Sequence, residues 1–348
     1  LINSPVVRGE PLKFSEEGVQ LVTRNIILPL WNSYSFFSTY ANADDISFKD
    51  LEKASPVQDR TMMDRWIISS MQSLVKTVNE KMENYYLYEV IPPLMNFVDE
   101  LTNWYVRSNR KRFWKEKDEN DIDKINAFKT LHEVLLEFSK CMAPVLPFIC
   151  EKIYQGLIEE ENQSIHYCNY PIAKESLIDS ELEENIELAK KVIKSVRNLR
   201  VKLKLPNKQP LNSVKIITKD REIENKLIVI SDLIKNELNV KEVLFDFDVD
   251  NWIDYEFKPN FKILGPKLGK QINKISEYLK NVDEITCDNI LQGNSVVIDG
   301  IKISSNEIDV ILNKKEEHEN QDIVDDFSLV LDTSCLLYTS DAADDPYG

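Results

Sequence analysis

Glycine and proline are scarce in this sequence, with 8 and 14 residues among 348. Such low numbers argue against a long flexible linker. Runs of about 18 apolar residues, which a membrane-spanning helix needs, are also missing. The first residues, Leu1–Pro5, lack the basic and apolar regions of a signal peptide. We therefore expect compact domains in a chain with no membrane partner.

The five cysteines follow no spacing pattern. They are Cys141, Cys150, Cys168, Cys287 and Cys335. An odd, widely scattered set favours free thiols in a reducing cytoplasm over a disulfide framework. His166 and Cys168 could join Cys141 and Cys150 as metal ligands, but no paired Cys-x-x-Cys spacing supports such a site. We expect a cytoplasmic protein without bound zinc.

Catalytic constellations are missing as well. The three histidines, His132, His166 and His318, stand apart from one another, without a nucleophile motif or a His-Glu-x-x-His arrangement. The sequence also has no glycine-rich phosphate loop. His132 is interpreted as a partly exposed helix residue. The residues themselves therefore predict no catalytic site, metal or cofactor in this chain.

Positive charge is in deficit, because 43 Lys and Arg stand against 59 Asp and Glu, which gives a net charge of −16. Much of the excess lies in Glu316–Gly348, which contains ten acidic residues and no Lys or Arg. Without this segment the net charge would be −6. An acidic chain does not attract nucleic acid as a whole, so any RNA contact must be local.

Apolar residues recur with helical spacing through the first part of the chain. Helices are expected over residues 15–40, with a bend at Pro29, over 63–82, over 85–114 with an interruption at Pro92 and Pro93, and over 122–142, 148–158 and 182–204. After Pro206 the pattern changes to strands at 214–217 and 240–247, helices at 221–238 and 265–279, and a hairpin at 295–303 that turns at Asp299-Gly300. The predicted fold is mainly α, a helix bundle followed by a smaller α/β domain.

Two short stretches concentrate the positive charge. Trp104–Lys117 has six basic residues, one acid and interleaved aromatics, and Lys194–Lys208 has six basic residues and no acid. On a helix, residues three apart share a face, as Arg107 and Arg110 do. Such rows can follow a phosphate backbone, and Trp or Tyr can stack on unpaired bases. The alternative stays open that the cations only complement a helix dipole and that the aromatics are core.

Several ordered motifs resemble isoleucyl-tRNA synthetase, a class I aminoacyl-tRNA synthetase. They are Ser4–Glu10, Phe14–Val19, Leu28–Phe37, Met63–Ile67, Phe97–Arg107 with Arg112–Trp114, Arg197–Arg200 with Gln209–Leu211, Lys258–Lys262 and Leu264–Gly269. Together they cover residues 1 to about 333, and the last of them look like the eukaryotic and archaeal type. The valyl and leucyl enzymes share the bundle, but residues 31–40 and 103–114 look like the isoleucyl enzyme.

The resemblance implies a parent enzyme that activates isoleucine with ATP and Mg²⁺ and transfers it to its tRNA. The catalytic domain, with His-Ile-Gly-His and Lys-Met-Ser-Lys-Ser signatures, would lie upstream, so the fragment alone is expected to be inactive. Residues 1–14 would be a remnant of the junction to that domain, residues 15–205 the anticodon-binding bundle, and residues 206–334 a C-terminal α/β domain. Residues 335–348 look like translated sequencing-adapter sequence and are expected to be a non-native tail.

The leading hypothesis from the resemblance is that the bundle binds the anticodon arm of isoleucine tRNA, with the catalytic domain of the full-length chain as a further partner. The proposed tRNA-binding residues are Trp104, Arg107, Arg110, Lys111, Arg112, Arg197, Arg200 and Lys204, of which Trp104 also fits a core position. A second hypothesis makes the fragment a structural scaffold that braces the catalytic domain. A third makes it a free-standing tRNA-binding factor.

Overall fold

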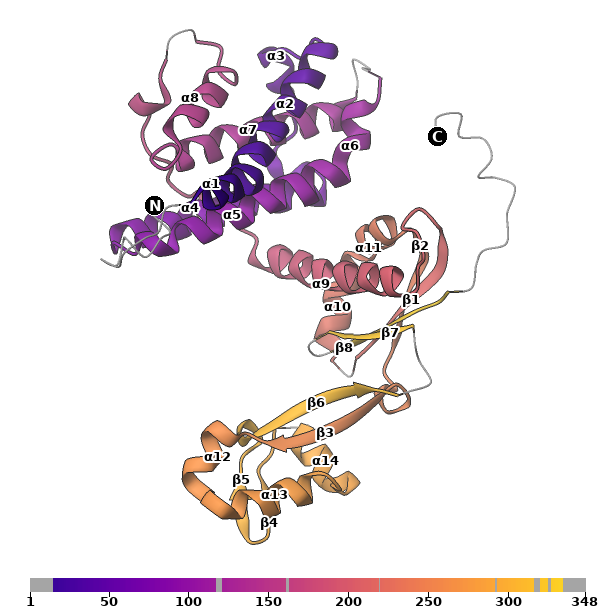
Figure 1. The fold of residues 1–348 in the computed structure, drawn as a ribbon. Coiled ribbons are helices and arrows are strands. Elements are labelled where there is room, and N and C mark those ends of the chain that lie inside the picture. Colours follow the sequence, from indigo (N-terminus) through magenta and orange to yellow (C-terminus); the bar gives the residue numbers. More distant parts are fainter. Residues whose placement is uncertain are drawn as a thin grey trace. The chain divides into compact units, whose positions relative to one another are not determined.

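The computed structural model describes residues 15–116, 121–160, 163–218, 220–291, 293–315, 320–324 and 327–333. The chain divides into two compact units, residues 1–184 and 185–348, and each is described by itself (Figure 1). The division falls inside helix α9 (Ser180–Lys202), before the boundary expected after residue 205, which stays a prediction. The expected junction remnant at 1–14, His318 and the tail at 335–348 with Cys335 lie outside the described residues.

Unit 1 is a bundle of helices, as the sequence predicted (Figure 1). Its helices are α1 (Glu16–Val22), α2 (Leu28–Ala43), α3 (Phe48–Leu51), α4 (Met62–Glu83), α5 (Ile91–Asp99), α6 (Arg107–Trp114), α7 (Ile122–Met142) and α8 (Pro147–Gln155). Two π-helical segments, Thr23–Ile27 and Glu100–Val106, continue α1 into α2 and α5 into α6. The helices therefore number more than expected, and all but α3, which lies between the first two predicted helices, occupy predicted stretches.

Pro92 and Pro93 lie at a helix start, whereas Pro29 lies just after the π-helical segment that leads into α2. Pro29 occupies the first turn of α2, and Pro92 and Pro93 occupy the first turn of α5, just after a 3₁₀ turn at Leu87–Glu89. At the start of α5 the first-turn N–H groups have no partner inside the helix, so Pro92 and Pro93 remove no hydrogen bond there. The expected interruption at Pro92-Pro93 is thus a helix start.

Helix α7 supplies much of the core of unit 1 and packs against α2, α4, α6 and α8 (Figure 1). Aromatic side chains fill the contacts between these helices. Phe97 of α5 stacks on Phe138 of α7, with ring centroids 5.4 Å apart. Phe113 of α6 meets Phe36 of α2 and Phe128 of α7 edge-on, at 5.1 and 5.0 Å. These buried rings fix α6 against its neighbours.

Unit 2 combines a mixed sheet with smaller strand pairs and helices, which agrees with the predicted α/β fold. After α9 it contains β1 (Leu211–Ile217), α10 (Arg221–Val229), α11 (Ser231–Leu238), β2 (Val240–Asp246), β3 (Ile253–Pro259), α12 (Phe261–Leu268), α13 (Ile272–Leu279), α14 (Glu284–Leu291), β4 (Val296–Ile298), β5 (Ile301–Ile303), β6 (Ile308–Lys314), β7 (Gln321–Val324) and β8 (Phe327–Leu331). The sheet order is β2-β1-β8-β7, with β1 parallel to β2 and β8 antiparallel to β1 and β7. Strands β3 and β6 form one further antiparallel pair, and β4 and β5 another.

The local features of unit 2 match the sequence better than its long-range pairings do. The β4–β5 hairpin turns at Asp299 and Gly300, both at positive φ (51° and 78°), as an Asp-Gly type I′ turn requires. The single helix expected at 221–238 is two helices, and the one expected at 265–279 begins earlier, at Phe261. A 3₁₀ turn at Gly269–Gln271 divides the latter. Strands β3, β6, β7 and β8 were not predicted.

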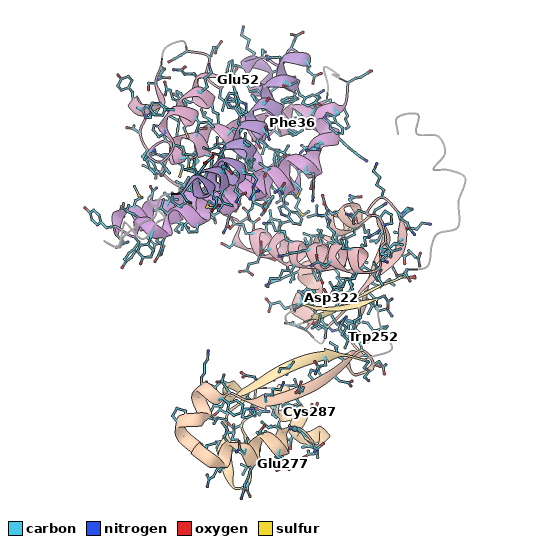
Figure 2. The ribbon with its side chains drawn as sticks, in the orientation of Figure 1. Phe36, Glu52, Trp252, Glu277, Cys287 and Asp322 are labelled. Atoms are coloured by element: carbon cyan, nitrogen blue, oxygen red, sulfur yellow. The ribbon has the colours of Figure 1, made fainter. Side chains whose placement is uncertain are left out.

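Side-chain contacts connect the strands of unit 2 to neighbouring segments. The indole Nε1 of Trp252, just before β3, donates to Asp246 at 3.1 Å, and the ammonium of Lys215 lies 4.9 Å from the same ring (Figure 2). Asp322 on β7 accepts a hydrogen bond from Ser195 of α9. These contacts join the end of β2, β1 and β7 to the segments packed around them.

His132 of α7 is buried, although the sequence suggested a partly exposed residue. Its side chain is 8% exposed, and its ring lies between those of Phe37 and Phe48, at 5.8 and 5.9 Å. Nε2 lies 2.7 Å from the carbonyl oxygen of Leu157, to which it donates in the neutral ring. Burial disfavours the charged ring and holds the pKa of His132 below its usual value.

Stability of unit 1 should therefore fall on mild acidification. The unfolded chain takes up a proton at His132 near its usual pKa, whereas the folded chain does so only at lower pH. The contribution of His132 to the free energy of unfolding should be constant above about pH 6.5. As the pH falls below that value, the free energy of unfolding should decrease by up to about 1.4 kcal/mol per pH unit. Urea unfolding between pH 5 and 8 measures this. His132→Gln, which keeps a donor for Leu157, should lose that part of the slope; an identical slope in both proteins would contradict the assignment.

Candidate nucleic-acid interface

The π-helical segment Glu100–Val106 helps to keep one face of the helix on the core as the chain enters α6. The buried residues of this stretch, Leu101, Tyr105, Asn109 and Phe113, recur every four residues. An α-helix has 3.6 residues per turn, so a four-residue repeat would drift around its surface. The wider turn of Glu100–Val106 takes up part of this drift, and the same face stays on the core. The opposite face of α6 is thereby directed to solvent.

The solvent side carries a row of basic and aromatic residues, here called the α6 stripe. Its members are Trp104, Arg107, Arg110, Lys111 and Trp114. Trp104, Arg107 and Arg110 are each three residues apart, and Lys111 and Trp114 follow Arg107 and Arg110 by four, so the five share one side of the helix. Arg110 and Lys111 are exposed, Trp114 is 54% exposed, and Trp104 and Arg107 are half-buried. The structure thus brings together four of the five residues predicted in the first basic stretch.

Arg107 and Trp104 form a cation–π pair at the N-terminal end of the stripe. The guanidinium carbon lies 5.6 Å from the centre of the indole. This contact orients both side chains and places a cation against one face of the ring. Arg110 and Lys111, one turn further on, have no salt-bridge partner among the residues that the structure describes. They can meet phosphate without giving up an internal ion pair.

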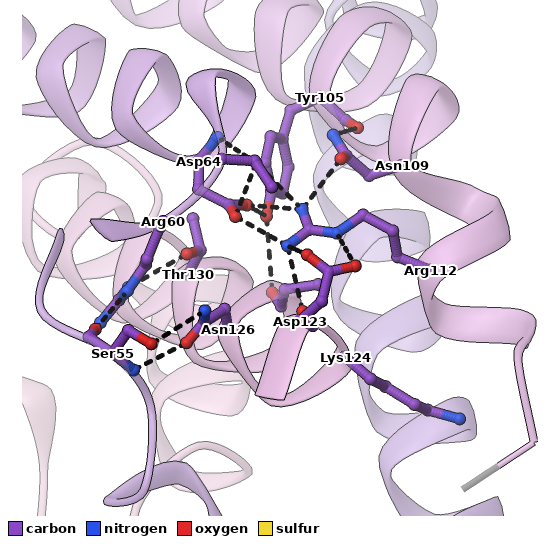
Figure 3. A network of polar contacts seen from close by, with 12 residues as sticks. Ser55, Arg60, Asp64, Tyr105, Asn109, Arg112, Asp123, Lys124, Asn126 and Thr130 are labelled. Atoms are coloured by element: carbon purple, nitrogen blue, oxygen red, sulfur yellow. Dashed lines mark hydrogen bonds and ion pairs between the residues drawn. The ribbon is translucent and has the colours of Figure 1, made fainter. Parts of the chain in front are cut away.

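Arg112, the fifth predicted residue of this stretch, points into a network between helices instead (Figure 3). Its Nη2 lies 2.8 Å from Oδ2 of Asp64 on α4 and 2.8 Å from Oδ1 of Asp123 on α7. The Tyr105 hydroxyl donates to the same Asp64 at 2.6 Å, and the Asn109 amide oxygen accepts from Arg112 at 3.0 Å. The tRNA contact expected of Arg112 stays a prediction. In the structure this side chain connects α6 to α4 and α7.

The charges of the network are strongly coupled. Burial alone would lower the pKa of Arg112, but hydrogen bonds and ion pairing with Asp64 outweigh it and raise that pKa above its usual value. Burial, with the nearby charge of Asp64, raises the pKa of Tyr105 well above its usual value. Arg112 therefore stays charged and Tyr105 neutral at any physiological pH, and the network keeps one arrangement.

Arg112 and Arg110 should respond differently to the same substitution. Arg112→Ala leaves Asp64, whose side chain is fully buried, without its cation, and should destabilise unit 1 by about 3–5 kcal/mol. Arg110→Ala removes an exposed side chain and should change stability by less than about 0.5 kcal/mol. Urea unfolding followed by circular dichroism compares them. Equal costs for the two variants would show that Arg112 has no special structural role.

The second basic stretch lies in unit 2, and two of its three predicted residues are engaged there. Arg197 forms an ion pair with Glu237 at 2.6 Å. Arg200 is 1% exposed, and its guanidinium donates to the carbonyls of Pro206, Gln209 and Leu238 at 2.8, 3.0 and 2.8 Å. Burial lowers the pKa of Arg200. Both side chains fasten the end of α9 to neighbouring segments, and their predicted tRNA contacts stay predictions.

Lys204 is the exposed member of that predicted set. It follows α9 at a positive φ of 54°, and the N–H of Leu205 donates to the carbonyl of Arg200 at 2.8 Å, which ends the helix. Its ammonium is accessible to a phosphate group. One lysine at a helix end, however, also suits the helix dipole, so the α6 stripe is the stronger candidate site.

Trp114 is the stripe residue that the sequence did not assign. The sequence left open whether the aromatics of this stretch are core, and Tyr105 and Phe113 are fully buried whereas Trp114 is 54% exposed. Its position, seven residues after Arg107 and four after Arg110, was the signal that could have placed it on the basic face. Because Tyr105 and Phe113 occupy the buried face, Trp114 lies on the exposed one.

The cysteines of unit 1 offer no alternative site. Cys141 and Cys150 are buried free thiols, and burial raises their pKa values to about 11 and about 12. Cys141 lies 3.2 Å from the hydroxyl of Tyr170, and Cys168 lies 3.0 Å from that of Tyr154. Across the described ranges, no group of three or more His, Cys, Asp or Glu side chains is placed to hold a metal ion. In the same ranges, no helix has the length and apolar character that crossing a membrane requires.

Comparison with known proteins shows similarity to tRNA ligases. Residues 64–216 match the family model described as the anticodon-binding domain of tRNA ligase. The isoleucine–tRNA ligase of Treponema denticola is 38% identical over 331 residues, which are 91% of this chain and 30% of that protein. The isoleucine–tRNA ligase of Bdellovibrio bacteriovorus is 35% identical over 95% of this chain and 31% of its own length, and that of Clostridium novyi is 40% identical over 83% and 27%. The chain spans about 30% of the length of these curated relatives.

Proposed function

We propose that this chain is the tRNA-binding part of an isoleucine–tRNA ligase and that the α6 stripe contacts the anticodon arm of isoleucine tRNA. The observation that carries the proposal is the stripe itself, a row of cations and indoles on a solvent-facing helix. It lies inside the segment that matches the anticodon-binding domain. The similarity to isoleucine–tRNA ligases over nine-tenths of the chain supports the choice of tRNA.

The distribution of charge supports a local contact. A chain with a net charge of −16 does not attract RNA as a whole, so RNA must bind where cations are gathered and unpaired. Arg110 and Lys111 meet that condition. Arg112 and Arg197 do not, because a phosphate would have to displace Asp64 or Glu237 from them. The proposed contact set is therefore smaller than the predicted one and includes Trp114.

The chemistry of ligation is proposed for the parent enzyme, in the cytoplasm, with ATP and Mg²⁺. The residues present here do not fit those groups. The sequence has no glycine-rich phosphate loop, and the described residues offer no cluster of metal ligands. No step of the reaction is therefore assigned to this chain, whose proposed contribution is to hold the tRNA.

The assignment to the eukaryotic and archaeal type remains part of the proposal. It rests on Lys258–Lys262 and Leu264–Gly269, which form the end of β3 and most of α12. The relatives named above are bacterial. They support the assignment to isoleucine–tRNA ligases but not the assignment to the eukaryotic and archaeal type.

A second candidate function, a scaffold that braces the catalytic domain of the full-length chain, is favoured by a different surface. Apolar side chains at the start of unit 1, namely Val19, Leu21, Val22 and Leu28, are 42–49% exposed. Such a patch suits a protein partner better than RNA. The two functions are compatible in one chain, and RNA titration separates them because only the first requires direct binding.

Substitutions in the α6 stripe should weaken tRNA binding in a salt-dependent way. Arg110→Ala and Lys111→Ala each remove one phosphate contact. Log affinity falls as log salt concentration rises, and each substitution should make this negative slope shallower by about 0.7–0.9. Fluorescence anisotropy with labelled isoleucine tRNA at several salt concentrations measures the slope. Lys152→Ala is the matched control, because Lys152 is an exposed lysine on α8, outside the stripe.

Two results would count against the proposal. If the unaltered chain does not bind isoleucine tRNA even at low salt, direct binding is wrong and the scaffold remains. If Lys152→Ala lowers affinity and slope as much as Lys111→Ala, the chain binds tRNA through diffuse charge rather than through the stripe.

A further inference from the structure

Trp114 has an exposure that the fold does not require. It is the last residue of α6 and its side chain is 54% exposed. Among the described residues, no ring, cation or hydrogen-bond partner contacts its indole. The neighbouring Phe113 is fully buried, which shows that a large ring at this end of α6 can be accommodated in the core. The indole of Trp114 is directed outward instead.

The backbone that carries Trp114 is held on both sides. Before it, Phe113 packs edge-on against Phe36 and Phe128, and Arg112 is paired with two carboxylates. After it, the carbonyl of Lys115 accepts from the ammonium of Lys124, which is itself 2% exposed. That ammonium also forms an ion pair with Asp44 of the α2 C-cap at 2.6 Å. The exposed indole is therefore carried by a fixed support, which lowers the cost of ordering it on binding.

From this placement we infer that Trp114 is a stacking platform for one unpaired nucleobase of the anticodon loop. The inference rests on the proposed function and specifies how the stripe reads single-stranded RNA. Every nucleobase has a π-face, and an exposed indole offers the matching surface. Arg110 and Lys111 are four and three residues before Trp114 and lie on the same face of the helix. At these spacings, the Cβ atoms of two helix residues are about 5–6 Å apart. They meet the phosphates that flank the stacked base.

Trp104 does not share this role. It is half-buried, and the guanidinium of Arg107 already covers its ring at 5.6 Å. A base would have to displace that guanidinium before it could stack. The two tryptophans of the stripe thus differ in function: Trp104 orients a cation, and Trp114 presents an open face.

Substitutions at Trp114 in the full 348-residue chain test the inference. The probe is the anticodon stem-loop of isoleucine tRNA with 2-aminopurine placed in turn at each loop position, because stacking changes the fluorescence of that base. Trp114→Ala and Trp114→Leu should weaken binding by about tenfold, and Trp114→Phe by no more than about threefold. Since no charge is lost, the salt slope should stay that of the unaltered chain. The fluorescence change at one loop position should vanish with Leu and remain with Phe.

Phe148→Leu provides the matched control, because Phe148 is an aromatic side chain of α8 that is 91% exposed. It should bind like the unaltered chain. Binding by the unaltered chain together with equal affinity of Trp114→Leu would overturn the stacking role and leave the proposed function standing. If the unaltered chain does not bind the stem-loop or the whole tRNA, the proposed function itself fails, and the inference with it. A loss that is equal for Trp114→Phe and Trp114→Ala would indicate a structural role and would also overturn the inference.

Discussion

The ion pair between Arg112 and Asp64 is the contact on which the arrangement of the proposed interface depends. It joins α6 to α4 across a buried position, and Asp123 extends the connection to α7. A buried ion pair of this kind adds little net stability compared with apolar packing. Any arrangement that separates its partners, however, leaves a buried charge without a counter-ion, which is strongly destabilising. It therefore fixes the rotation of α6. Once Arg112 faces the carboxylates, Arg110, Lys111 and Trp114 must face solvent.

The same principle separates structural from available arginines in both basic stretches. Arg112 and Arg197 neutralise carboxylates, and Arg200 satisfies three backbone carbonyls at the end of α9. Arg110 has no such partner within the described residues. Arginines that are already paired inside the protein are less available to an anion than arginines that are not. Counting charges in a stretch of sequence cannot make this distinction.

Much of the fold was predictable from the sequence because its determinants are local. The helical spacing of apolar residues predicted α4, α7, α8 and α9, and the Asp299-Gly300 pair predicted the β4–β5 hairpin. Pairings between distant segments escaped prediction, as with Ile253 of β3 and Lys314 of β6. Periodicity within one segment carries no information about the segment that will pair with it.

The candidate site was predictable in part for the same reason. Spacing alone put Arg107 and Arg110 on one helix face, and the structure keeps them there. It could not tell that Arg112 would find Asp64, 48 residues away, nor that Trp114 would point outward while Tyr105 is buried. Both outcomes follow from the rotation of α6, which long-range contacts set. The family resemblance located the stretch but did not sort its residues.

Photochemical crosslinking tests the central claim, that RNA meets the outer face of α6, most directly. Isoleucine tRNA with 4-thiouridine in its anticodon loop would be irradiated in complex with the full chain, and the modified residues would be identified by mass spectrometry. The account predicts adducts on the α6 stripe, above all at Trp114. Adducts confined to other helices of unit 1 or to unit 2, with none on α6, would contradict it.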